Sequence, residues 1–204
     1  MPEPTPTRGR PTLSQDALAE RRDEIASVAL RLFLSEGFAS VSMRRLGKEV
    51  GLTPMALYRY YPSKLDILAR LWGYIIGKAF EGVTAAAHGA DTPEDALSRA
   101  AQAYVSYWCE NKDHYHLVFM NPGVTDTDVR SFVGEEETIA QYDVFFQAVA
   151  KVRSADRMAP SVKIATDGLI CHLHGIMHSL ITIQGYPWTE ADTLVADAVE
   201  RVGR

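Results

Sequence analysis

Residues 41–64 read VSMRRLGKEVGLTPMALYRYYPSK, and they carry the signals for two short helices joined by a tight turn. Ser42 can cap a first helix, and Gly51 can adopt the positive φ that ends it. Thr53 can cap a second helix with Pro54 in its first turn, where a missing N–H costs nothing. We therefore predict a helix-turn-helix held together by the burial of its apolar residues, namely Leu46, Val50, Leu52 and Leu57.

The same stretch is strongly basic. Glu49 is its single acidic residue against five basic ones, a balance of +4, and we expect the five to remain available outside: Arg44, Arg45, Lys48, Arg59 and Lys64. A short helix with such a surface fits the DNA major groove, where basic and hydroxyl groups hold phosphates. Three closely spaced tyrosines favour this reading because their hydroxyls can reach phosphates; they are Tyr58, Tyr60 and Tyr61. The alternative is an ordinary helical hairpin with a solvated basic face.

Three strings in this stretch resemble the DNA-binding domain of the TetR (tetracycline-repressor) family of bacterial transcription regulators. They are Ser42-Met-Arg-Arg-Leu, Gly51-Leu-Thr-Pro and Ala56-Leu-Tyr-Arg-Tyr-Tyr-Pro-Ser-Lys64. The resemblance implies an all-α protein with an N-terminal three-helix helix-turn-helix domain and a C-terminal helical bundle. It also implies a homodimer, in which the last two helices of each subunit form a four-helix bundle.

The resemblance further implies roles for single residues. Arg44 matches a position that reaches a base edge, and arginine suits bidentate contact with guanine. Four residues match groove-facing positions of the second helix: Pro54, Met55, Arg59 and Tyr60. Four others match phosphate-contacting positions, which set affinity and not specificity: Ser42, Thr53, Tyr58 and Lys64.

Charge is divided unevenly along the 204 residues. Up to Arg70 there are 11 Lys and Arg against 8 Asp and Glu, a net of +3, whereas the remainder has 10 against 18, a net of −8. Phosphate binding therefore belongs to the N-terminal third. We expect a disordered basic arm over 1–13, the DNA-binding domain over 14–70, and a ligand-binding and dimerisation domain over 71–204. The arm contains Arg8-Gly9-Arg10-Pro11, which resembles a minor-groove AT-hook, although a solvated tail is the alternative.

Cap and periodicity signals predict helices through the rest of the chain. The expected segments are 14–36, 64–88, one from Thr92 through Trp108, 114–120, 135–152, 161–184 and a last helix from Thr189. Ser14 should cap the first of these and Gly37 should end it. Ser63, with Asp66 at the third position, should cap the second, and Tyr104 should lie on the buried face of the third. The helix over 64–88 would be a lever between the two domains. The helix over 161–184 is apolar around most of its circumference and must be covered on two sides. Its glycines, Gly168 and Gly175, would permit close approach of a second subunit.

Apolar and polar side chains in the C-terminal part have the composition of a small-molecule site. The expected lining is Trp108, Phe119, Met120, Tyr142, Phe146, His174 and Met177, with ordinary core packing as the alternative. Cys171, His174 and His178 share one helical face and could bind a transition metal. A structural or pocket-lining role is the stronger interpretation, so we predict neither a metal nor a cofactor.

Several function classes lack support in the sequence. It has no glycine-rich phosphate loop, nucleophile elbow or paired carboxylates, so we predict that the protein is not an enzyme. Two distant cysteines, Cys109 and Cys171, and the lack of a long apolar run indicate a reduced, cytoplasmic protein outside the membrane. The prediction is a ligand-responsive repressor that binds a palindromic double-stranded operator as a homodimer and is released by a largely apolar small molecule. The alternatives are a helical small-molecule-binding or catalytic protein and a metal-responsive regulator.

Overall fold

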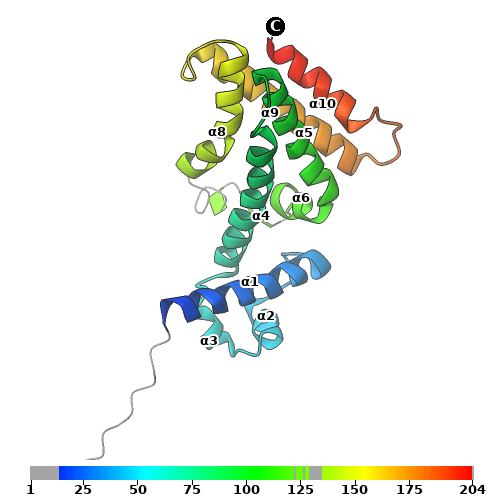
Figure 1. Ribbon diagram of the computed structural model, residues 1–204. Helices are drawn as coiled ribbons and strands as arrows, with labels where there is room; N and C mark the ends of the chain where they lie inside the picture. The colour runs from blue at the N-terminus through cyan, green and yellow to red at the C-terminus, as the bar shows by residue number, and fades with distance from the viewer. Residues whose placement is uncertain (1–13, 122, 126, 129–134, 204) are drawn as a thin grey trace, which may run out of the picture. The chain divides into compact units, whose positions relative to one another are not determined.

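The structure, a computed structural model, describes residues 14–121, 123–125, 127–128 and 135–203, and within these ranges it contains helices and no strand (Figure 1). The all-α prediction is confirmed. The chain divides into two compact units, the first ending at Leu68 and the second beginning at Ala69. Arg8 to Pro11, where we predicted an AT-hook, lie outside the described residues.

The first unit is built on α1 (Gln15–Glu36), against which α2 (Met43–Glu49) and α3 (Pro54–Tyr58) fold. The Ser14 hydroxyl accepts a hydrogen bond from the Ala17 N–H at 3.2 Å, so the predicted cap is confirmed. Gly37, at φ 81°, ends the helix as expected. The apolar stripe of α1 is buried and supplies the core of the unit through Ile25, Ala26, Ala29, Leu32 and Phe33.

Helix α4 (Lys64–Ala87) begins in the first unit and continues into the second. Its start is fixed by a reciprocal pair of hydrogen bonds. The Asp66 N–H donates to the Ser63 hydroxyl at 3.2 Å, and that hydroxyl donates to the Asp66 carboxylate at 2.7 Å. The Ser63 hydroxyl thus caps α4 as predicted, and the Asp66 carboxylate accepts from that hydroxyl, where a capping box would use the Ser63 backbone N–H.

Helix α5 (Pro93–Glu110) lies at the centre of the second unit. It contacts α8 (Glu135–Val152), α9 (Pro160–Thr182) and α10 (Ala191–Glu200), and α6 (Lys112–Phe119) follows it directly (Figure 1). A short 3-10 turn, η1 (Arg201–Gly203), closes the chain. The Thr92 hydroxyl caps α5 by accepting from the Asp95 N–H at 3.1 Å. The buried face of α5 comprises Leu97, Ala100, Ala101, Tyr104, Val105 and Trp108.

The connection between α9 and α10 differs from the prediction. Helix α9 ends at Thr182, and α10 begins at Ala191 after Glu190, which makes no capping hydrogen bond with its side chain. The predicted cap at Thr189 is therefore wrong. The Trp188 indole N–H donates to the Ile183 carbonyl at 2.9 Å, which places the intervening loop by a contact that the local cap pattern does not reveal.

Helix α9 buries one stripe within the chain and leaves the opposite side open. The buried stripe comprises Val162, Thr166, Leu169, Leu173, Met177 and Ile181. On the other side Ile164 is 72% exposed. A Cβ atom added at Gly168 or Gly175 would meet none of the described atoms within 4 Å. The expected close approach at these glycines is thus not made within the described part of the chain.

Among the helices described, none has the combination of length and apolar character that crossing a membrane requires.

Candidate nucleic-acid interface and aromatic cluster

Each helix of the helix-turn-helix begins at the predicted capping residue. The Ser42 hydroxyl accepts from the Arg45 N–H at 3.1 Å, and the Thr53 hydroxyl accepts from the Ala56 N–H at 3.2 Å. Both caps lie on the surface. Gly51 has φ 69°, so the turn uses the left-handed conformation that glycine allows.

Gly47 determines how closely the two helices of the motif approach, and we did not assign it a role from the sequence. A Cβ atom there would lie 2.8 Å from the Leu52 carbonyl oxygen. Leu52 also donates its N–H to the Gly47 carbonyl at 2.8 Å. A glycine inside a seven-residue helix was the available signal, because glycine is unfavourable there unless another backbone comes close.

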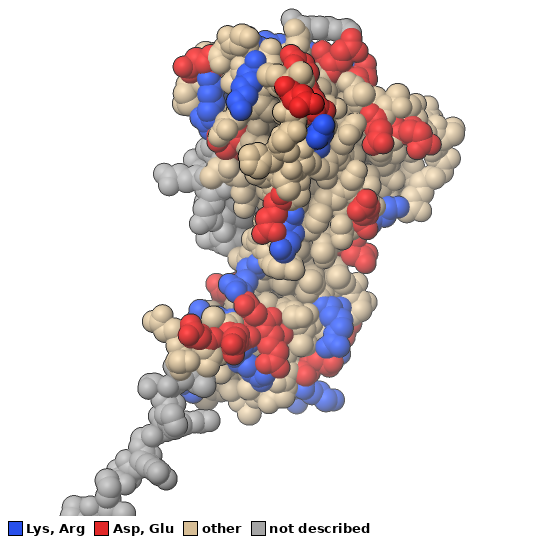
Figure 2. Space-filling model, in the orientation of Figure 1, with Lys and Arg blue, Asp and Glu red and all other residues tan. Residues whose placement is uncertain are grey.

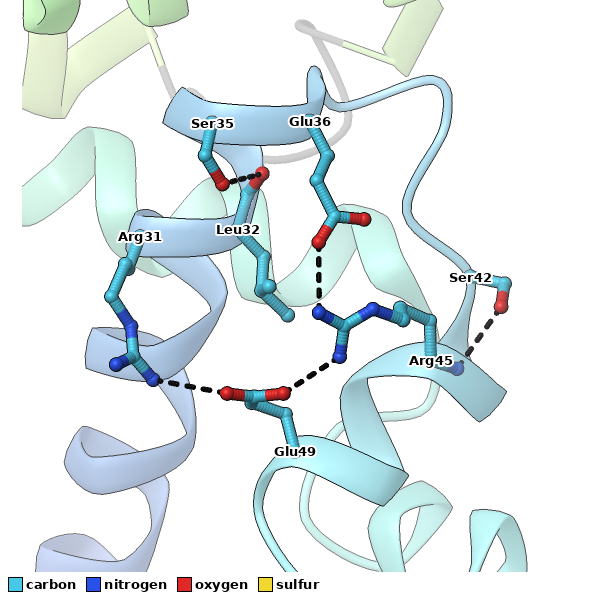
Figure 3. Close-up of polar contacts among 7 residues, drawn as sticks. All are labelled: Arg31, Leu32, Ser35, Glu36, Ser42, Arg45 and Glu49. Carbon is cyan, nitrogen blue, oxygen red and sulfur yellow. Dashed lines mark hydrogen bonds and ion pairs between the residues drawn. The ribbon is translucent and has the colours of Figure 1, made fainter.

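Arg45 lies at the surface but is paired with two carboxylates, so its charge is not free as we expected. Its guanidinium lies 2.7 Å from Glu49 and 2.8 Å from Glu36, and Arg31 approaches Glu49 at 3.5 Å (Figure 3). The hydrogen bond from Arg45 is the main reason that the pKa of Glu49 is lowered. The network ties α1 to α2. Figure 2 shows basic and acidic side chains interspersed on the visible face of this unit.

Lys64 is also engaged within the unit. Its ammonium donates to the Phe38 carbonyl at 2.6 Å and to the Ala39 carbonyl at 3.4 Å, and it lies 4.2 Å from the centroid of the Phe38 ring. Burial lowers the pKa of Lys64. The lysine therefore anchors the turn after α1. The expectation that it remains free is wrong, while its contact with a DNA phosphate stays a prediction.

The three tyrosines of the motif have different environments. Tyr58 is 51% exposed, Tyr60 is half-buried, and Tyr61 is in the core. The Tyr61 hydroxyl donates to the Arg22 carbonyl at 3.1 Å, and Arg22 in turn donates to the Tyr60 carbonyl at 3.2 Å. Arg21 donates to the Val50 carbonyl at 2.9 Å, so α1 holds both helices of the motif by backbone contacts.

Several predicted DNA-contacting side chains remain exposed. Met55 is 81% exposed, and Arg44, Pro54 and Arg59 are also on the surface. An open hollow of about 560 Å³ lies at the turn of the motif; it is lined by Ser42, Arg44, Arg45, Lys48, Leu52 and Pro54. With Arg45 occupied by carboxylates, Arg44 and Lys48 are the lining side chains that offer positive charge to a phosphate or base.

Residues 25–71 match the sequence model described as bacterial regulatory proteins, tetR family. The N-terminal part of the chain is a TetR-family domain. The matched residues cover most of α1, the whole helix-turn-helix and the start of α4, which is the part whose capping and close packing are described above.

Two curated relatives are each similar to part of this chain. The nucleoid occlusion factor SlmA of Mannheimia succiniciproducens is 34% identical over 83 residues, which are 40% of this chain and 38% of that protein. The transcriptional activator FasR of Mycolicibacterium smegmatis is 24% identical over 132 residues, 65% of this chain and 60% of that protein. The chain thus spans less than two thirds of the length of either relative.

The fold is shared over almost the whole length with a solved structure. The crystal structure of the putative regulatory protein SCO4313 superposes with a TM-score of 0.74 at 22% identity, covering 94% of this chain and 98% of that chain. Both units therefore have the arrangement of elements found in an all-α regulator.

The second unit brings four of the predicted ligand-lining residues together with one that we did not predict. Tyr104 O–H lies 3.0 Å from Tyr142 O–H and 3.1 Å from His174 Nε2. Phe119 contacts both His174 and Trp108, with ring centroids 5.1 and 4.9 Å apart. We call Tyr104, Trp108, Phe119, Tyr142 and His174 the aromatic cluster. Tyr104 could have been included from its spacing, one helical turn before Trp108.

The other three predicted lining residues differ in burial, and their role in a ligand site stays a prediction. Met177 is fully buried in the stripe of α9, and Met120 is 41% exposed. Phe146 packs under the Arg157 guanidinium at 5.7 Å.

The histidines considered for a metal are bonded to tyrosines. His178 Nδ1 lies 3.1 Å from the Tyr115 hydroxyl, and His174 Nε2 contacts Tyr104 and Tyr142. Cys171 is exposed on α9. Within the described ranges, no three His, Cys, Asp or Glu side chains come close enough together to hold a metal ion.

Proposed function

We propose that this protein is a transcriptional regulator that binds a palindromic DNA operator as a homodimer and leaves it when a small molecule binds the second unit. The observation that carries the proposal is the helix-turn-helix itself. Its helices are capped by Ser42 and Thr53, Gly47 sets their close approach, and its exposed basic side chains lie on a TetR-family domain. Such a unit places its second helix in the major groove.

The exposed side chains have different tasks in this proposal. Arg44 reads a guanine edge, and Met55 and Pro54 offer apolar contact to a thymine methyl. Ser42, Thr53, Tyr58 and Lys48 contact phosphates and set affinity on every sequence. Two such units in a dimer would enter successive major grooves about 34–36 Å apart, which requires a palindromic operator.

The open side of α9 supports a dimer through α9 and α10. A helix that buries only one stripe within its own chain, yet carries Ile164 at 72% exposure and two unpacked glycines on the other side, gains by burying that side against a second copy. The aromatic cluster supports the effector site, because it combines apolar rings with a few polar groups.

An effector that binds one conformation of the dimer more tightly would shift the population toward it. Operator affinity then falls by the difference in binding energy. We propose repression as the outcome of operator binding, by occupation of promoter DNA in the cytoplasm, and we propose no catalytic role.

Fluorescence anisotropy with DNA from upstream of the protein's own gene tests this function. Titration at two salt concentrations should give tight, salt-sensitive binding at least about 1,000-fold stronger than binding to a scrambled duplex of equal length. Binding no stronger than to the scrambled duplex would require a genome-wide selection of bound fragments. If that selection returned no enriched sequence, the regulator would be excluded.

A further inference from the structure

The aromatic cluster contains a buried hydrogen-bond donor without an acceptor. The chain has three tryptophans, and two of them donate their indole N–H to a carbonyl: Trp72 to Leu117 at 3.1 Å and Trp188 to Ile183 at 2.9 Å. Trp108 is fully buried, yet its Nε1 has no hydrogen-bond partner among the described residues. A donor removed from water without an acceptor is unfavourable, so this site has a reason to take one up.

The neighbouring hydroxyls add a second donor. The Tyr104 hydroxyl lies 3.0 Å from the Tyr142 hydroxyl and 3.1 Å from His174 Nε2. The Tyr142 hydroxyl lies 3.4 Å from the same nitrogen. When the imidazole nitrogen accepts from one hydroxyl, the other hydroxyl donates either to the first hydroxyl or, when a ligand is bound, to the ligand. Burial raises the pKa of Tyr104 well above its ordinary value. The nearby Trp108 N–H lowers that pKa by a smaller amount, although its geometry does not make a hydrogen bond. The tyrosine therefore keeps its proton at neutral pH.

A second buried side-chain N–H group, like that of Trp108, lacks an acceptor. Asn121 Nδ2, two residues beyond Phe119, is buried and has no partner within the described ranges. Both of the buried side-chain atoms that lack partners there are N–H donors, and none is an acceptor. A ligand that pairs with the Trp108 donor must therefore supply a hydrogen-bond acceptor, for which a carbonyl oxygen is suited.

The surroundings favour an uncharged ligand. Phe80 and Phe145 pack on Tyr104, with ring centroids 5.5 and 5.7 Å away. The hydrogen bonds and ring contacts of the cluster, as far as the structure describes them, involve no Lys or Arg. Burial lowers the pKa of His174, so its ring supplies no positive charge at neutral pH. An anion in such surroundings would lose its hydration without compensation.

Access to the cluster is available at its outer edge. Phe119 is 38% exposed, although its ring contacts both Trp108 and His174. The Phe119 ring is therefore a part of the cluster that a ligand can reach from solvent.

We propose that the effector is an uncharged, largely apolar molecule with a carbonyl-type oxygen, which accepts hydrogen bonds from Trp108 Nε1 and a hydroxyl of the Tyr104–Tyr142 pair. The regulatory role of this ligand rests on the proposed function. The binding site itself is independent of DNA.

Three probes of similar size separate the chemical requirements: acetophenone, which has a neutral carbonyl, ethylbenzene, which lacks oxygen, and benzoate, which is an anion. The full-length protein is labelled with ¹⁵N, and the three indole N–H signals are followed at pH 7 during each titration. Trp72 and Trp188 are internal controls because their N–H groups already donate to carbonyls. Trp108→Phe assigns the third signal.

Acetophenone should move the Trp108 signal downfield and leave the other two in place, whereas ethylbenzene should cause no downfield shift and benzoate should bind at least about threefold more weakly. Tyr142→Phe should weaken acetophenone about 3- to 10-fold, the range of one hydrogen bond, and Tyr186→Phe should not. A Trp108 signal that ignores acetophenone, or benzoate binding as tight as acetophenone binding, overturns the proposal.

The same titrations are followed by anisotropy with operator DNA. A Trp108 shift with no loss of DNA binding would confirm the ligand site and reject its role as an effector site. Operator binding that is intact while acetophenone leaves Trp108 unchanged would reject the ligand class and leave the regulator standing.

Discussion

The carbonyl oxygen of Leu52 lies 2.8 Å from the point that a Cβ atom on Gly47 would occupy. Real Cβ atoms do not approach a backbone oxygen so closely, and this oxygen belongs to the turn that is itself fixed by the Leu52 N–H bond to Gly47. The packing of the helix-turn-helix therefore depends on a missing side chain as much as on the apolar residues that fill its core.

Gly47→Ala should lower the free energy of unfolding of the first unit by about 1–3 kcal/mol, because backbone must move to admit the methyl group. Gly73→Ala in α4 is the matched control. A Cβ there meets no described atom within 4 Å, and removing a glycine from a helix interior should stabilise by about 0.5–1 kcal/mol. Urea unfolding followed by circular dichroism measures both. Equal stability of the two variants would show that the turn can relax at no cost.

Lys64→Met tests the predicted phosphate contact of this lysine against its contacts within the protein. If its ammonium serves only to hold the Phe38 and Ala39 carbonyls, the variant should bind every DNA sequence more weakly with an unchanged salt dependence. Lys48→Met is the comparison, since Lys48 is exposed in the hollow of the motif. Its loss should reduce the slope of log affinity against log salt by about 0.9, the value for one phosphate contact. A reduced slope for Lys64→Met would instead place that lysine on a phosphate.

Arg44→Ala should relax sequence preference at one operator position by about 1–3 kcal/mol, the value of a bidentate base contact. Tyr58→Phe should weaken all sequences alike, because its hydroxyl is assigned to a phosphate. Competition binding with a panel of single-base operator variants distinguishes the two patterns. Unchanged discrimination in Arg44→Ala would remove this residue from base reading.

Acid should weaken the tie between α1 and α2. Hydrogen bonding from Arg45 lowers the pKa of Glu49 in the folded protein, with smaller contributions from the charges of Arg31 and Lys48. A depressed folded pKa gives stability that is present above the unfolded pKa and lost as pH falls through the folded one. Between about pH 5 and 3 the wild type should therefore lose more stability than Glu49→Gln.

Thermal unfolding across that pH range measures the difference, and Glu110→Gln serves as the control for removal of one acidic residue elsewhere. The ion pairs around Glu49 are solvent-exposed, so the effect should also shrink at high salt. Parallel pH curves for wild type and Glu49→Gln would show that the network contributes nothing to stability.

Gly175→Leu should leave the single chain folded but split the dimer, because the new side chain meets no described atom of its own chain and would occupy the space of the second copy. Gly82→Leu in α4 is the control, since Gly82 is likewise exposed and without neighbours. Light scattering during size-exclusion chromatography gives the mass of each. If the Gly175→Leu variant stays dimeric, the dimer interface does not include this part of α9.

The accuracy of the sequence predictions depended on how far apart the interacting residues lie. The caps at Ser14, Ser42, Thr53 and Thr92 were predicted because each acts on a backbone group three residues away. The predicted cap at Thr189 was wrong. The loop there contains a hydrogen bond from the Trp188 indole N–H to the Ile183 carbonyl, five residues away, and the local cap pattern does not indicate this contact.

The basic surface was predicted less well for the same reason. Arg45 finds Glu36 across nine residues and Lys64 finds Phe38 across twenty-six, and neither pairing has a local signature. The aromatic cluster was recovered in four of its five members, whereas Tyr104 was assigned only to the core. Its hydroxyl meets Tyr142 and His174 from two other helices, which periodicity within one helix does not indicate.

The backbone bonds by which α1 holds the helix-turn-helix all begin and end within the first unit, from Arg21 to Val50, from Arg22 to Tyr60 and from Tyr61 back to Arg22. Natural selection can therefore alter the aromatic cluster without disturbing the helix-turn-helix. The same separation favours exchange of the two units between relatives, and a sensor for a new compound could be obtained by changing α5, α6, α8 and α9 while its promoter stays the same.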